Sequence, residues 1–330
     1  RGRELQNLLL ARIYLLQGLR DDDIVHSVYG HGMINGGHYV RETFTHWTRA
    51  IFLSAGTGVE TRSATQVELL RDFGATVIVG FGDYIKYLAS VARNAGIDPA
   101  RDLKVRMISA HVGADRDAVS AAWGGIPVYD WYGVGDTGLI AGDGPDRAGL
   151  YVMEDAHYLE LLDIDSDRPI VDPAATGNMV VTVLFKDDIY PMIRFNTHDV
   201  TGFRTDASPL GLKLKRIRGF LGRSDNMVKL RGINVFPQAI GAILAELPSF
   251  AGDYLCRVAR DAAGRDEMTV LVEVRDPAEA PLAERYRSTL KTKLGVDVRV
   301  EFHAPGALGA QTGVEARQKP IRLIDERTKQ

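Results

Sequence analysis

Cysteine is the scarcest residue in this sequence of 330 residues, in which Cys256 is the only one. A disulfide framework needs pairs of cysteines, so disulfides within the chain cannot hold it together. Cys256 itself lies among apolar residues in the stretch 253–258, which predicts a strand position rather than a reactive thiol. The fold must therefore depend on the burial of apolar side chains.

Long apolar runs and a large excess of one charge are also missing. No apolar stretch approaches the roughly 20 residues that a membrane-spanning helix needs. The net charge of −3 gives no basic field for nucleic acid or an anionic membrane. Residues 5–19 predict a helix. Its apolar residues and nearby arginines make a transit peptide an alternative there, although the less favoured one. We expect a cytoplasmic protein that binds neither nucleic acid nor a membrane.

Apolar residues are nevertheless plentiful, because 45% of the chain is hydrophobic and 25% is charged. This length and composition suffice for a sizeable core and for two domains. Periodicity predicts an α/β layer, with helices at 65–73 and 82–94 and strands at 75–79, 105–109 and 126–129. Strands at 151–163, 177–184 and 192–203 follow, and then a small α+β module with helices at 238–247 and 281–294 and strands at 254–260, 268–274 and 296–302.

Residues 222–237 combine charge, a turn and two glycines between apolar segments. Residues 227–230 predict a short strand, and Gly232 supplies backbone freedom. The pattern predicts a hinge, with a charged surface turn as the alternative. The segment resembles the domain junction of the phenylacetate–CoA ligase-like branch of adenylate-forming enzymes, in which Arg-x-Asp leads into a small mobile C-terminal domain. The resemblance implies Asp225 as the hinge and Arg223 as a nucleotide-binding residue.

A second segment, residues 128–138, is an aromatic strand that runs into a glycine-rich turn ending in a carboxylate. An aromatic face could stack on adenine, and a short acceptor could bind its amino group. An acid could bind a magnesium ion. The turn resembles the family's Tyr-Gly-x-Thr/Ser-Glu motif, although Asp136 replaces the Glu and Gly135 replaces the hydroxyl residue. The resemblance implies nucleotide contacts from Asp130, Tyr132 and Gly133, and a catalytic, metal-binding role for Asp136.

A third segment, residues 190–201, resembles the family's Arg-Tyr-x-Thr-x-Asp motif. In that family the aspartate at the end of a strand accepts hydrogen bonds from both ribose hydroxyls, which requires an ionised acceptor. Asp199 takes this place. His198 beside it is more typical of a surface or structural residue, because the sequence has no other His or Cys at metal-ligand spacing to it.

The C-terminal run 318–325 resembles the family's Gly-Lys-x-x-Arg-x-x-Asp ending, with Gln318 in place of the Gly. In the family a mobile lysine neutralises charge on the α-phosphate and on the attacking carboxylate. Lys319 is the matching residue, and the resemblance implies that it is catalytic. A solvated surface lysine is the alternative interpretation of this position.

Residues 26–38 resemble the glycine-rich strand and helix start beside the acyl pocket of phenylacetate–CoA ligases. Glycines let a backbone approach a ligand closely, and apolar side chains between them can line a cavity. Tyr29, Met33 and Ile34 are the acyl-pocket candidates, with ordinary core positions as the alternative.

The family's phosphate loop has no good match. Residues 54–61 look similar, but in the family order they lie downstream of that loop. The loop would therefore precede Arg1, and we expect an incomplete, processed or naturally shortened form. Residues 140–149 contain no cysteine where some relatives bind zinc, so we expect no zinc.

The expected fold is α/β plus α+β. It comprises an incomplete adenylate-forming N-terminal domain with a β-rich subdomain at 1–222, a hinge at 223–225 and a small mobile C-terminal domain at 226–330. The resemblance implies that ATP and Mg²⁺ convert an aryl or acyl carboxylic acid into an acyl-adenylate, which then passes to CoA. An adenylating enzyme without CoA and a non-catalytic nucleotide- or acid-binding relative stay open, as does the oligomeric state, for which the family often shows a homodimer.

Overall fold

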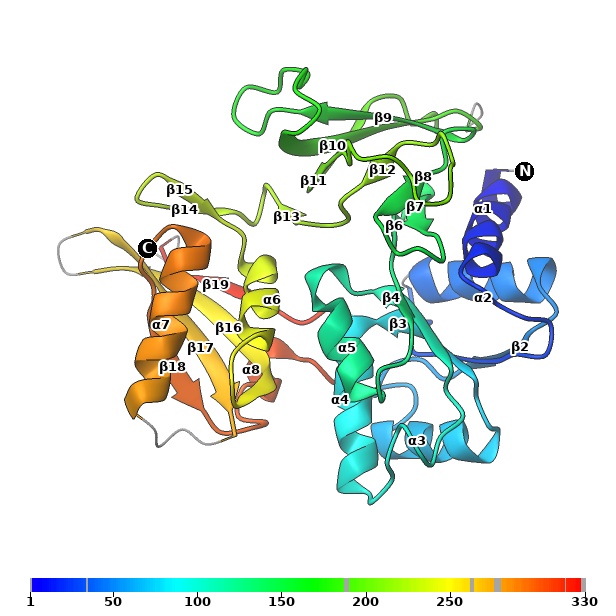
Figure 1. The fold of residues 1–330 in the computed structure, drawn as a ribbon, viewed down its shortest axis with the longest axis horizontal. Helices are drawn as coiled ribbons and strands as arrows, with labels where there is room; N and C mark the ends of the chain where they lie inside the picture. The colour runs from blue at the N-terminus through cyan, green and yellow to red at the C-terminus, as the bar shows by residue number, and fades with distance from the viewer. Residues whose placement is uncertain are drawn as a thin grey trace. The chain divides into compact units, whose positions relative to one another are not determined.

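A computed structural model describes residues 2–33, 35–186, 190–261, 264–275, 280–317 and 319–327 (Figure 1). The chain divides into two compact units, Arg1–Leu221 and Gly222–Gln330. We call them unit 1 and unit 2 and describe each by itself. No helix within the described ranges is long and apolar enough to cross a membrane.

Unit 1 begins with a five-stranded parallel sheet in the order β2-β1-β3-β4-β5. Its strands alternate along the chain with helices, as the periodicity predicts for an α/β layer (Figure 1). The strands are β1 (Ile24–Ser27), β2 (Ile51–Ser54), β3 (Val77–Phe81), β4 (Met107–His111) and β5 (Val128–Tyr129), and the helices are α1 (Gly2–Leu16), α2 (Asn35–Trp47), α3 (Ser63–Asp72), α4 (Gly82–Asn94) and α5 (Arg116–Ala122).

Apolar side chains cover both faces of this sheet. Successive side chains of a strand point to opposite faces, so Val77 and Val79 of β3 lie on one face and Ile78 on the other. Val77 and Val79 pack in a core cluster with Tyr14 of α1 and Phe44 of α2. Ile78 packs in a second cluster that contains residues of α3, α4 and α5, including Leu70, Leu88 and Val119. This explains why β3 and β4 are apolar along most of their length.

The rest of unit 1 is antiparallel and corresponds to the expected β-rich part. One sheet has the order β12-β8-β7-β6, and β9, β10 and β11 pair in a second sheet. Both sheets contribute side chains to one core cluster, such as Ile140 of β7 and Met179 of β10. The strands are β6 (Trp131–Val134), β7 (Gly138–Asp143), β8 (Leu150–Val152), β9 (His157–Leu162), β10 (Thr176–Val183), β11 (Phe195–Gly202) and β12 (Arg216–Ile217).

One expected strand of this region is in fact two. Residues 151–163 contain the end of β8 and all of β9, because a turn closes between them with a 2.9 Å hydrogen bond from the Ala156 amide to the Met153 carbonyl. The turn carries the consecutive charges of Glu154 and Asp155, which a continuous buried strand would not tolerate.

Unit 2 is built on a four-stranded sheet in the order β18-β17-β16-β19. The central pair is antiparallel and both outer strands run parallel to their neighbours. Its elements are β13 (Gly222–Arg223), β14 (Val228–Leu230), β15 (Ile233–Val235), the 3₁₀ turn η2 (Pro237–Ala239), α6 (Ile240–Ala245), β16 (Phe250–Arg260), β17 (Asp266–Val274), α7 (Ala280–Leu294), β18 (Arg299–His303), α8 (Gly309–Thr312) and β19 (Leu323–Asp325).

The short strand expected at 227–230 is the first half of a hairpin. Its two central residues, Arg231 and Gly232, both have positive φ angles, +50° and +84°. A tight type I′ turn requires this conformation at both positions, and glycine adopts it without strain. Elsewhere in unit 2 the expected helix at 238–247 is shorter, because a 3₁₀ turn forms its first residues. Periodicity does not predict the final strand β19, because its three residues are too few to show an alternating pattern.

Candidate functional site

The turn between β6 and β7 positions most of the nucleotide-binding candidates of unit 1. A Cβ atom at Gly133 would lie 2.4 Å from the Gly138 carbonyl oxygen, so no larger residue fits there without a shift. Gly138 itself has a φ angle of +75°, and the β6–β7 register shifts between Tyr132 and Gly133. The close approach of the two strands at this bulge therefore explains the glycine at position 133.

Tyr132 and Asp199 meet in the interior. The Tyr132 hydroxyl donates a 2.5 Å hydrogen bond to Asp199 Oδ2, and both residues are buried. The sequence separates them by 67 positions, so two independent candidates are brought together by the fold. This hydrogen bond fixes the tyrosine ring and holds the carboxylate of β11 beside it. His198, the residue before Asp199 in the same strand, is exposed.

Asp130 lies just before β6 and is also buried. Its carboxylate accepts hydrogen bonds from the backbone amides of Val112 and Gly113, at 3.4 and 3.1 Å. Burial, together with the nearby charge of Asp143, raises the pKa of Asp130 to about 7. A carboxyl group that titrates near neutrality can donate or accept a hydrogen bond, which marks Asp130 as a candidate functional residue.

Asp143 and Arg116 support Asp130. The sequence motifs predict a role for neither of them. The backbone amide of Asp130 donates to Asp143 Oδ2 at 2.6 Å, and the Asp143 amide donates to the Asp130 carbonyl at 2.9 Å. Arg116 Nη2 lies 2.7 Å from Asp143 Oδ2, so the buried Asp143 has a cationic partner. No motif links these positions, and only the pairing of β6 with β7 and the placement of α5 could reveal them.

Asp136, the metal candidate, is exposed in the turn between β6 and β7. Its backbone carbonyl oxygen accepts a hydrogen bond from Lys186 Nζ. No group of three or more His, Cys, Asp or Glu residues in the described ranges could hold a metal. A single exposed carboxylate fits a magnesium ion whose other ligands are substrate phosphates and water.

The acyl-pocket candidates have contrasting environments. Tyr29 is buried among aromatic rings, with centroid distances of 5.2 Å to Phe81, 5.9 Å to His111 and 6.4 Å to Trp131. Met33 is fully exposed, and Ile34 lies outside the described residues. The structure thus places Tyr29 in an aromatic cluster next to β6, while Met33 does not share that environment.

Unit 2 holds the remaining candidates. The guanidinium of Arg223 pairs with the Asp225 carboxylate in a two-pronged contact of 2.7 and 2.5 Å. Lys319 is exposed in the segment between α8 and β19, and Gln318 lies outside the described residues. Cys256 lies in β16 and is completely buried, which raises the pKa of its thiol to about 12 and leaves it unreactive.

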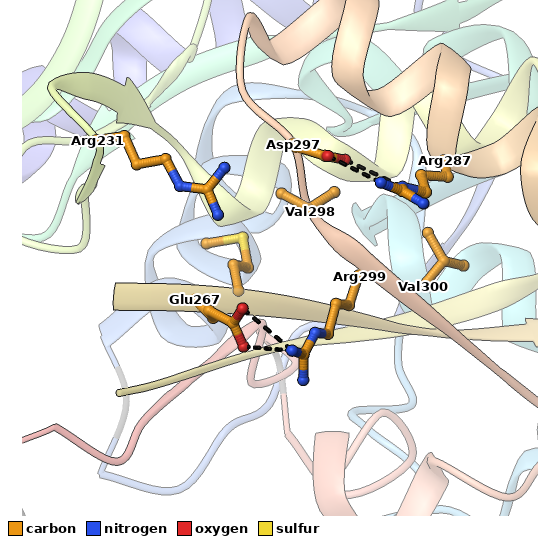
Figure 2. Close-up of a pocket in the computed structure, with 8 residues that line it drawn as sticks. Arg231, Glu267, Arg287, Asp297, Val298, Arg299 and Val300 are labelled. Carbon is orange, nitrogen blue, oxygen red and sulfur yellow. Dashed lines mark hydrogen bonds and ion pairs between the residues drawn. The ribbon is translucent and has the colours of Figure 1, made fainter. Parts of the chain in front are cut away.

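Unit 2 also has an open cavity of about 410 Å³ beside β17 and β18 (Figure 2). Two of its arginines already have acidic partners, Arg287 with Asp297 at 2.9 Å and Arg299 with Glu267 at 2.9 Å. None of the residues expected to be functional lines this cavity. Its charges are largely neutralised within the protein, so we assign no ligand to it.

Comparisons with known proteins agree with this arrangement. Residues 232–327 match the AMP-binding enzyme C-terminal domain family. The chain is 30% identical to the phenylacetate-coenzyme A ligase of Pseudomonas putida, over 97% of this chain and 72% of that protein. It is 29% identical to the enzyme of the same name from Aromatoleum evansii, over 98% of this chain and 73% of that protein.

The fold also has a solved counterpart. The crystal structure of 2-hydroxyisobutyryl-CoA ligase in the postadenylation state, in complex with R3-HIB-AMP, matches with a TM-score of 0.84 and 26% identity. The match covers 99% of this chain and 70% of that one. A helix-flanked parallel sheet, a β-rich part with the Tyr132 turn and a separate C-terminal module are the parts of an adenylate-forming acid–thiol ligase. Within this class, the chain belongs to the phenylacetate–coenzyme A ligase family. The resemblance drawn from the sequence motifs and the expected fold class are thereby confirmed.

Proposed function

We propose that this protein activates an aryl or acyl carboxylic acid with ATP and then transfers the acyl group to CoA. In the first step a carboxylate oxygen attacks the α-phosphorus, the bond to pyrophosphate breaks and an acyl-adenylate forms. In the second step the CoA thiolate attacks the acyl carbon and AMP leaves. The observation that carries the proposal is the buried contact between Tyr132 and Asp199, because it unites two motifs with complementary nucleotide-binding roles.

The nucleotide contacts follow from the chemistry of the side chains. The ring of Tyr132 presents a flat face against which adenine can stack, with Gly133 allowing close approach of the backbone. The carboxylate of Asp130 can accept the exocyclic amine, and that of Asp199 can accept the ribose hydroxyls. Arg223 supplies a cation for the same nucleotide.

The chemical step needs charge neutralisation more than acid–base catalysis. We assign Mg²⁺ to Asp136, where the ion would offset charge on the phosphate oxygens. Lys319 would stabilise the charge that develops between the α-phosphate and the attacking carboxylate. Tyr29 and its aromatic neighbours favour an aromatic or apolar acid, with Met33 and Ile34 as further pocket candidates.

The domain organisation belongs to the same proposal. We propose that residues 1–222 form the AMP-binding domain, that 223–225 form a hinge at Asp225, and that 226–330 form a mobile domain. Such a hinge would let the small domain present Lys319 for the first step and withdraw it for the second. A cytoplasmic location and a homodimer complete the proposal.

Calorimetry with AMP tests the nucleotide site. Asp199→Ala removes an acceptor for the ribose hydroxyls and should weaken AMP binding by about 1–3 kcal/mol. His198→Ala is the matched control, because that side chain is exposed one position away and should leave the affinity unchanged. Formation of acyl-CoA from ATP, Mg²⁺, CoA and a panel of aryl and alkyl acids tests turnover. Absence of AMP binding would refute the nucleotide site, whereas AMP binding without turnover by any acid would favour a non-catalytic binding protein.

A further inference from the structure

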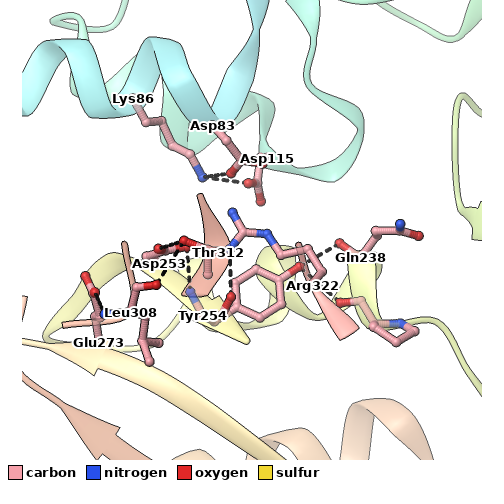
Figure 3. Close-up of polar contacts among 11 residues, drawn as sticks. Asp83, Lys86, Asp115, Gln238, Asp253, Tyr254, Glu273, Leu308, Thr312 and Arg322 are labelled. Atoms are coloured by element: carbon pink, nitrogen blue, oxygen red, sulfur yellow. Dashed lines mark hydrogen bonds and ion pairs between the residues drawn. The ribbon is translucent and has the colours of Figure 1, made fainter. Parts of the chain in front are cut away.

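The two ends of the segment that carries Lys319 converge on one carboxylate. Thr312, the last residue of α8, donates a 2.7 Å hydrogen bond from its hydroxyl to Asp253 Oδ2. Arg322, the residue before β19, donates from Nη1 to the other oxygen, Oδ1. Figure 3 shows these three side chains together, with Asp253 contributed by β16.

All three residues of this cluster are buried, so the contacts are shielded from water. Arg322 has further support from the Tyr254 carbonyl, which accepts a 2.7 Å hydrogen bond, and from the Tyr254 ring, 4.4 Å from its guanidinium carbon. A buried ion pair contributes little net stability, because desolvation offsets its attraction. It does favour one conformation of the segment strongly over others, because a conformation that separated Arg322 from Asp253 would leave an uncompensated buried charge.

Backbone hydrogen bonds close the same segment at its base. The Ile321 amide donates to the Thr312 carbonyl at 2.9 Å, and the Cys256 amide of β16 donates to the Arg322 carbonyl at 3.0 Å. The Arg317 amide donates to the Gly313 carbonyl at 2.8 Å within the segment. Lys319 stands three positions before Arg322 and is exposed. Its side chain therefore projects from a backbone whose two ends are held together.

We propose that Asp253, with Thr312 and Arg322, is a positioning cluster that sets the place from which Lys319 acts during adenylation. The inference rests on the function proposed above. A flexible lysine stabilises a transition state efficiently only when its backbone is already placed, because reorganisation then costs little. The cluster fixes the backbone from which the Lys319 side chain extends toward the α-phosphate.

The test separates the two half-reactions in the full chain. Asp253→Asn removes the charge that pairs with Arg322, and Thr312→Val removes the hydroxyl with little change in shape. We expect each variant to lower the turnover number for pyrophosphate release roughly 10- to 100-fold, with KM for ATP and acid unchanged. Thioester formation from preformed acyl-adenylate should change less than about twofold, because that step does not use Lys319. Thr312→Ser keeps the hydroxyl and should recover most of the adenylation rate that Thr312→Val loses.

Asp297→Asn is the matched control, since it weakens the ion pair with Arg287 in the same unit without touching the Lys319 segment. Amide hydrogen exchange provides a readout that does not depend on activity. Exchange at residues 313–321 should accelerate in Asp253→Asn and Thr312→Val and stay unchanged in Asp297→Asn. Unchanged exchange in both cluster variants would overturn the inference, and so would equal losses in both half-reactions. Accelerated exchange in a chain that forms no adenylate at all would instead refute the proposed function.

Discussion

At the scale of single residues, the carboxyl groups of Asp130 and Asp143 distinguish this site from an ordinary surface turn. Burial and the charge of Asp143 raise the pKa of Asp130 to about 7, whereas burial and the charge of Asp146 raise that of Asp143 to about 6. Arg116 opposes the shift at both groups and contacts Asp143 directly. Because Arg116 contacts Asp143 directly, it favours the ionised form of Asp143 more strongly than that of Asp130.

This titration predicts a pH dependence of nucleoside binding. If ionised Asp130 accepts a hydrogen bond from the amino group of adenine, protonation below pH 7 removes the negative charge of the acceptor and weakens binding. Adenosine, which has no titrating phosphate, should bind about tenfold more weakly at pH 6 than at pH 8. Calorimetry across this range measures the effect, and Asp130→Asn should flatten it. A profile that is already flat in the unmodified protein would show that Asp130 does not contact the base as an anion.

At the scale of elements, the β6–β7 hairpin carries Tyr132 in β6 just before a bulge and Asp136 in the turn that follows. The crowding of Gly133 against the Gly138 carbonyl makes this hairpin sensitive to one added methyl group. A Cβ at the neighbouring Gly135 would meet no atom within 4 Å. Steric crowding thus requires a glycine at position 133 but not at position 135.

Gly133→Ala should therefore destabilise unit 1, by about 1–3 kcal/mol, because the strands must move apart. Gly135→Ala should change stability by less than about 0.5 kcal/mol. Urea unfolding followed by circular dichroism measures both variants under the same conditions. Similar losses of stability in the two variants would contradict the close approach seen at Gly133.

At the scale of the whole molecule, the candidates are divided between the two units. Unit 1 contains Asp130, Tyr132 and Asp199, whereas unit 2 contains Asp225 and Lys319. A reaction that uses all of them needs both units, and the two half-reactions provide a way to separate their contributions.

Lys319→Ala should reduce acyl-adenylate formation by roughly two to three orders of magnitude, because one electrostatic group is lost from the transition state. Thiol transfer from preformed acyl-adenylate should be nearly spared. Asp225→Pro should do the opposite, since proline restricts the backbone at the proposed hinge. Rapid-quench measurement of each half-reaction tests the pair, and equal effects of both changes on both steps would rule out the two-arrangement mechanism.

The sequence alone determined the family, the fold class and most helices and strands. Local periodicity marks apolar strands such as β3 and β4. Short motifs propose Tyr132, Asp199 and Lys319 as site candidates, because the spacing of each motif is local. Only the tertiary structure decided that Tyr132 contacts Asp199, that Arg116 and Asp143 support Asp130, and that Thr312 and Arg322 share Asp253. Each of these contacts joins residues far apart along the chain, so their geometry depends on how strands pair and helices pack, which no local pattern encodes.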